Sequence, residues 1–150
     1  MGFTRYWTIK KEIPHDKFDE FISYARILTE YHINNGIKLA SYDGTGEPKF
    51  DEEHLSLNGV GEESHESFDI TRVPGICEWD RSDDGRDFCK TNNKPYDRVV
   101  YELLCLAQYI FGKDYITFSG DDDGANEEPY DTTHLKLIIR DKKIDGIINE

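Results

Sequence analysis

Two stretches of the chain repeat apolar residues at three- and four-residue steps, and this spacing predicts two amphipathic helices. The first follows Pro14, a residue that helices favour in their first turn, and ends at Asn34, Asn35 and Gly36. Its expected buried stripe is Phe18, Phe21, Ile22, Ala25, Leu28 and Tyr31. The second helix opens at Pro95 and closes at Gly112, with a stripe of Tyr96, Val99, Val100, Leu103, Leu104, Ala107 and Phe111.

Apolar and polar positions alternate elsewhere, which predicts strands over 5–10, 54–59, 66–73, 87–91 and 115–119, and a short one over 37–41. The strands over 54–59 and 66–73 form a hairpin around the turn 59–64. Leu135, Leu137 and Ile139 alternate in the same way. We therefore expect a last strand over 133–140, continued by 144–148 in a hairpin.

This order of elements predicts a single α+β domain over residues 1–150, with an antiparallel sheet and both helices on one of its faces. The arrangement is that of a βαββαβ, ferredoxin-like sandwich with one or more C-terminal strands added. The opposite face of the sheet would carry His54, Ser56 and Asn58. It would be open, or covered by the long polar loops.

The excess of acidic over basic residues excludes some classes of binding partner. Lys plus Arg number 18 against 31 Asp plus Glu, a formal net charge of -13, and such a chain repels phosphate backbones at long range. General nucleic-acid binding is therefore not expected. A membrane partner is not expected either, because no apolar stretch is long enough to span a bilayer. The three cysteines are an odd, widely spaced set, and the first residues lack a signal-peptide core, so we predict a cytoplasmic protein.

The turn after the predicted strand 54–59 holds the first candidate site. Asn58, Gly59 and Gly61 fall where the backbone N–H groups of two nearby glycines can point into one concavity and hold an anion. A tight hairpin turn that needs positive φ is the alternative. His65 and Glu66 follow, and an imidazole beside a carboxylate can act as a base or bind a divalent metal. His65 is equally compatible with capping the turn.

The segment before the second helix holds the other candidates. Backbone donors, the helix dipole and the nearby lysines would lower the pKa of a Cys89 thiol, so that Cys89 and His65 would form a nucleophile and base. A small buried cysteine is the alternative. Lys90, Thr91 and Lys94 group positive charge and a hydroxyl at a helix N-terminus, where phosphate or carboxylate binds. Asp97, in the first turn, also favours the dipole.

Two loops offer oxygen ligands in number, over 80–87 and 121–128. A divalent cation such as calcium or magnesium could bind there. The twelve-residue spacing of an EF-hand is missing, however, so solvated acidic loops are the preferred interpretation. No cofactor is predicted.

Three phrases of the chain resemble one family: MGFTRYW at the start, LNGVGEESHESF in the middle and FCKTNNKPYD before the second helix. The resemblance is to small proteins of bacteria, their phages and large DNA viruses that open with Met-Gly-Tyr-Thr-His-Tyr-Trp. It covers most of the first 125 residues and implies site residues without implying a reaction. It adds Tyr96 to the ligand-binding candidates. Phe3 and Arg5 depart from the family's Tyr and His.

Three hypotheses of function remain. In the first, the glycine turn, His65 and the segment around Lys90 and Lys94 surround a small anionic or nucleotide-like ligand. In the second, the protein is a hydrolase or transferase that uses Cys89 or a water activated by His65. In the third, its acidic surface binds a basic partner. The first is preferred, and it requires the hairpin and the start of the second helix to meet; the oligomeric state stays open.

Overall fold

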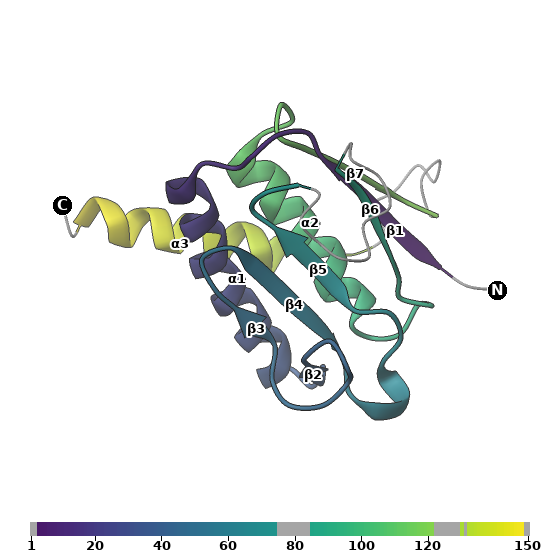
Figure 1. The fold of residues 1–150 in the computed structure, drawn as a ribbon. Coiled ribbons are helices and arrows are strands. Elements are labelled where there is room, and N and C mark those ends of the chain that lie inside the picture. The colour runs from purple at the N-terminus through teal and green to yellow at the C-terminus, as the bar shows by residue number, and fades with distance from the viewer. Residues whose placement is uncertain (1–2, 75–84, 122–129, 131, 149–150) are drawn as a thin grey trace.

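The computed structural model describes residues 3–74, 85–121, 130 and 132–148, and it has an α+β fold (Figure 1). Within these residues three α-helices accompany two antiparallel sheets. The elements in chain order are β1 (Thr4–Ile9), α1 (His15–Asn34), β2 (Leu39–Ala40), β3 (Lys49–Phe50), β4 (His54–Gly59), a 3-10 turn (Gly61–Glu63), β5 (Phe68–Thr71), β6 (Arg86–Lys90), α2 (Asp97–Phe111), β7 (Ile116–Gly120) and α3 (Thr133–Ile148).

The strands form two sheets where the sequence predicted one. The first has the order β6-β1-β7, and in the second β4 pairs with β2, β3 and β5. The predicted hairpin is confirmed, because β4 and β5 pair from His54 opposite Thr71 to Leu57 opposite Phe68. The sheets meet where the Glu66 N–H donates to the Lys90 carbonyl at 3.2 Å. Strands β5 and β6 are not paired with each other within the described residues, so the two sheets stay separate.

Helices α1 and α2 pack on each other and lie on the same side of the strands, as predicted (Figure 1). The α2 stripe is buried as expected. The α1 stripe turns differently at its end, because Tyr31 is 37% exposed whereas Thr29 and His32 are buried. Since His32 lies four residues after the buried Leu28, it occupies the next position on the same helical face. No helix in the described part of the chain is long and apolar enough to cross a membrane.

The predicted C-terminal strands are wrong, because residues 133–148 form the helix α3. Leu135 is buried, and Ile138 and Ile139 pack against the core, whereas Leu137 is 45% exposed. The alternating pattern required Leu137 to point inward with Leu135. The burial instead follows three- and four-residue steps, which are those of a helix lying against α1.

Candidate functional site

The two segments that carry the predicted site do meet, and Glu66 joins them. Its backbone N–H donates to the Lys90 carbonyl, and its Oε1 accepts the Lys90 N–H at 2.6 Å. The Glu66 carbonyl accepts a hydrogen bond from the Tyr96 hydroxyl at 2.6 Å and another from the Cys89 thiol at 3.3 Å. The hairpin, β6 and the start of α2 are therefore tied together at one residue.

Cys89 does not have the properties of an activated nucleophile. It is fully buried on the inner face of β6, and burial raises the pKa of its thiol well above the ordinary value. The prediction of a lowered pKa is therefore wrong. Desolvation is the largest effect on the pKa of the thiol and outweighs the hydrogen bond with Tyr96, which acts in the opposite direction. His65, the proposed base, is exposed.

The glycine turn uses its donors within the protein. The Gly59 N–H donates to Oδ1 of Asn58, and the Gly61 N–H donates to the Gly44 carbonyl. Asn58 is buried and its amide also bonds the backbone N–H and carbonyl of His65. Gly61 has φ +56°, and a Cβ at Gly59 would lie 2.1 Å from the Glu63 carbonyl oxygen. These facts favour the alternative of a tight structural turn over an anion nest.

Asp97 is fully buried and lies at the centre of a hydrogen-bonded cluster. Arg5 binds it through two nitrogens, Nε to Oδ1 at 3.1 Å and Nη2 to Oδ2 at 2.9 Å. The Thr91 hydroxyl donates to Oδ1 at 2.6 Å and the Tyr130 hydroxyl to Oδ2 at 2.7 Å. Burial and the hydrogen bond to Asp97 raise the pKa of the Tyr130 hydroxyl. Thr91 and Asp97, both predicted to bind ligand, thus bind each other.

Phe3 and Arg5, near the start of the chain, contact one another. The Arg5 guanidinium lies over the Phe3 ring, 4.6 Å from its centroid, and 4.9 Å from the centroid of Tyr101. Cation–π contacts of this kind stabilise a partly desolvated guanidinium. Arg5 therefore has a structural role, as the buried cation that neutralises Asp97.

The predicted site residues that stay accessible lie at the surface around Lys90. His65, Glu66 and Lys90 are exposed, and Lys94 is half-buried, whereas Asn58, Thr91, Tyr96 and Asp97 are buried. Burial also raises the pKa of the Tyr96 hydroxyl. Of the acidic loop 80–87, residues 80–84 lie outside the described residues. Of the loop 121–128, only Asp121 is described.

Lys90 belongs to an exposed face of the sheet β6-β1-β7 that the sequence did not single out. Strand pairing places Lys90 opposite Thr4, Phe88 opposite Tyr6, and Arg86 opposite Thr8. We call this the outer face; it consists of Thr4, Tyr6, Thr8, Arg86, Phe88, Lys90, Thr117 and Ser119. Phe88 is 58% and Tyr6 43% exposed, and the Tyr6 hydroxyl donates to Asp121 at 3.2 Å.

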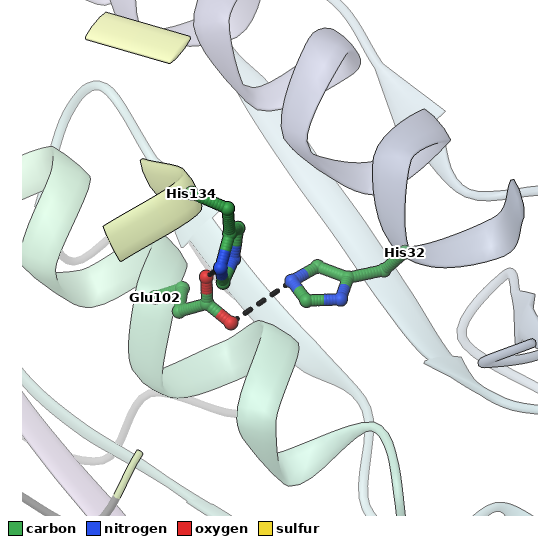
Figure 2. A group of neighbouring side chains, drawn as sticks. All are labelled: His32, Glu102 and His134. Carbon is green, nitrogen blue, oxygen red and sulfur yellow. Dashed lines mark ion pairs between the residues drawn. The ribbon is translucent and has the colours of Figure 1, made fainter. Parts of the chain in front are cut away.

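A second group of polar side chains lies between the three helices. His32 of α1, Glu102 of α2 and His134 of α3 point toward one another (Figure 2). His32 Nε2 lies 2.9 Å from Oε2 of Glu102, and His134 Nε2 forms an ion pair with Oε1. The sequence analysis missed this group because its members lie far apart in the chain and follow no metal-binding spacing. The available signal was that His32 and Glu102 continue buried stripes, four residues after Leu28 and three after Val99; for His134 the pattern gave no such signal.

Comparison with protein-family models, with curated proteins and with solved structures finds no match for this chain. Its function must therefore be argued from these two places, the outer face around Lys90 and the polar group between the helices.

Proposed function

We propose that the protein binds a small anionic ligand with an aromatic ring, such as a mononucleotide, on the outer face of the sheet β6-β1-β7. The observation that carries the proposal is the pair Tyr6 and Phe88. The two rings are directly opposite in the strand register and both are exposed. Exposed aromatic residues on neighbouring strands form a flat surface on which a base can stack, worth about 1–3 kcal/mol per base.

The charges around the rings favour an anion at one edge. Arg86 and Lys90 lie on either side of Phe88 along β6, on the same face of the sheet. Asp121 lies toward β7 and holds the Tyr6 hydroxyl. A ligand whose base covers Tyr6 and Phe88 would therefore direct its phosphate toward β6 and a neutral hydroxyl-bearing part toward Asp121.

A small ligand fits the net charge of the chain better than a polymer does. With a formal charge of -13, the protein repels a long phosphate backbone, whereas the single phosphate of a mononucleotide can lie beside Arg86 and Lys90. His65 and Glu66 border this region, because Glu66 is hydrogen-bonded to Lys90. Of the residues predicted from sequence, Lys90 and His65 thus remain ligand-binding candidates.

The test is a titration of the isotopically labelled protein with AMP, GMP, CMP and UMP, followed by NMR. We expect at least one of them to shift the resonances of Tyr6, Phe88 and Lys90. Phe88→Ala should weaken its binding by about tenfold or more, since one stacking contact is lost. Tyr42→Ala is the matched control, because Tyr42 is an exposed aromatic residue on the loop after β2.

Adenosine and inorganic phosphate separate the two parts of the proposed ligand. If AMP binds no more tightly than adenosine, the phosphate contributes nothing to the affinity, and Lys90 has no role in binding it. If none of the four mononucleotides shifts the outer face at millimolar concentration, the proposal is wrong. An acidic surface that binds a basic partner would then be the hypothesis to pursue.

A further inference from the structure

We infer that His32, Glu102 and His134 form a binding site for one divalent transition-metal ion, with zinc as the preferred ion. The three residues come from three different helices, and each offers one ligand atom (Figure 2). All three ligand atoms lie within 4.8 Å of one another. Among the described residues, this is a place where imidazole nitrogens and a carboxylate converge in the interior.

The hydrogen-bonding state of these atoms supports the inference. His32 Nε2, His134 Nε2 and Glu102 Oε1 are buried, yet each lacks a hydrogen bond within the described part of the chain. The side chains of His32 and Glu102 are almost completely buried, so bulk solvent does not reach these atoms. The two imidazoles are ion-paired with the Glu102 carboxylate, but the contacts do not have hydrogen-bond geometry. Leaving a buried polar atom without a hydrogen bond costs about 1–3 kcal/mol. A metal ion placed between the three atoms would coordinate all of them.

The donor set selects the class of metal. Two imidazole nitrogens and one carboxylate oxygen are typical of zinc sites that have three protein ligands and leave a fourth position for water. Magnesium and calcium prefer oxygen ligands alone. With metal–ligand distances of about 2.0–2.1 Å, tetrahedral ligand atoms lie about 3.4 Å apart. His32 Nε2 lies 2.9 Å from Oε2 of Glu102, and the three ligand atoms lie within 4.8 Å of one another, so side-chain shifts of about 1–1.5 Å bring them to this spacing.

Two neighbours hold the ligands in position. Arg98 Nε donates to Oε2 of Glu102 at 3.1 Å, which orients the carboxylate and leaves Oε1 facing His134. The Tyr31 ring stacks on the His134 imidazole with a centroid distance of 4.6 Å and an interplanar angle of 9°. Partners that orient the ligands in this way are a usual feature of metal sites. The positive charge of Arg98 also lowers the affinity for a cation, so moderate affinity is expected.

The experiment uses the full chain, stripped with EDTA and then titrated with Zn²⁺ in a calorimeter. We expect one Zn²⁺ to bind per chain, and Mg²⁺ at the same concentration to give no such binding. His32→Ala and His134→Ala should each weaken Zn²⁺ binding by more than about 100-fold, because loss of an orienting partner alone costs 10–100-fold. His15→Ala is the matched control, since His15 is exposed at the start of α1.

Substitution with Co²⁺ keeps the test informative if a variant does not fold. Bound by the unaltered protein, Co²⁺ should give the visible absorption of a four- or five-coordinate nitrogen and oxygen site. Absence of one-to-one Zn²⁺ binding by the unaltered protein would overturn the inference. So would Zn²⁺ binding that is unchanged in folded His32→Ala and His134→Ala, because the ion would then be held elsewhere, for example by acidic loops.

Discussion

Helix α2 carries two fully buried carboxylates, Asp97 and Glu102, and their surroundings differ in completeness. Both carboxylate oxygens of Asp97 accept hydrogen bonds, from Arg5 and Thr91 at Oδ1 and from Arg5 and Tyr130 at Oδ2. Glu102 faces two imidazoles, but its Oε1 and both facing ring nitrogens lack hydrogen bonds within the described residues. A carboxylate whose oxygens are all hydrogen-bonded has a structural role, whereas side-chain atoms without hydrogen bonds remain able to coordinate a metal ion.

The two clusters also differ in where their cations lie. The Arg5 side chain is only 3% exposed, so both charges of its pair with Asp97 have left water. The Arg98 side chain beside Glu102 is 35% exposed and keeps contact with solvent. Removing one partner of a buried ion pair is more costly than removing one partner of an exposed pair, because the remaining charge stays in the interior.

The largest effect expected from this comparison is that of Asp97→Asn. It leaves the Arg5 guanidinium buried without its counterion, and we expect the free energy of unfolding to fall by about 3–5 kcal/mol. Glu102→Gln in metal-free protein should cost less, about 1–2 kcal/mol, because Arg98 can turn toward water. Urea denaturation followed by tryptophan fluorescence measures both. Equal losses in the free energy of unfolding would mean that the two carboxylates contribute equally to stability.

Zinc should stabilise the protein through the Glu102 cluster and not through the Asp97 cluster. At a free Zn²⁺ concentration about 100 times Kd, binding to the folded state adds about 2.7 kcal/mol to the free energy of unfolding. We expect this increment for the unaltered protein and for a folded Thr91→Ser variant, whose Asp97 cluster alone is changed. Glu102→Gln should lose most of the increment. A rise in stability that persists in Glu102→Gln would place the bound ion outside the helix cluster.

The two clusters also show which features of the fold could be predicted from the sequence. The α2 stripe and the β4–β5 hairpin follow from periodicity and turn residues. The meeting of the hairpin with the start of α2 was required by the ligand-binding hypothesis and did not follow from the pattern. Which polar side chains point into the core cannot be predicted from periodicity. Asp97 lies three residues before the stripe residue Val100 and is buried, although a charged residue in a first turn is usually solvated.

The helix cluster was beyond sequence analysis for a different reason. Its three members are brought together only by the packing of α1, α2 and α3. The segment that carries His134 was assigned to a strand, because Leu135, Leu137 and Ile139 fit alternation and a helix about equally well over a short span. Only the contact with α1 decides between them, and that contact requires the tertiary structure.

Within the Asp97 cluster, Thr91 offers a smaller and more local test. Thr91→Val keeps the shape of the side chain and removes the hydroxyl that donates to Oδ1 of Asp97. A hydrogen bond to a charged group contributes about 1.5–3 kcal/mol, so we expect a loss in that range. Thr91→Ser restores the donor and should recover most of the stability. If both variants lose the same amount, packing of the methyl group rather than the hydrogen bond stabilises the cluster.

A third carboxylate, Asp69 of β5, is intermediate in burial and should show the smallest effect. Although burial acts in the opposite direction, hydrogen bonds from His54 and Ser67 hold the pKa of Asp69 below its ordinary value. A lowered pKa in the folded state stabilises the protein above the ordinary Asp value of about 3.9, and this contribution is lost as the pH falls below it. We therefore expect Asp69→Asn to cost up to about 1 kcal/mol at neutral pH, with the difference from the unaltered protein closing in acid.

The matched control for that measurement is Asp19→Asn, since Asp19 is exposed on α1. Urea denaturation of the two variants and the unaltered protein at a series of pH values gives the comparison. A cost of Asp69→Asn that is the same in acid as at neutral pH would show that the substitution acts by changing the packing of the hairpin. A cost that closes in acid assigns the effect to the charge, which then ranks Asp69 below both buried carboxylates of α2 because solvent still reaches it.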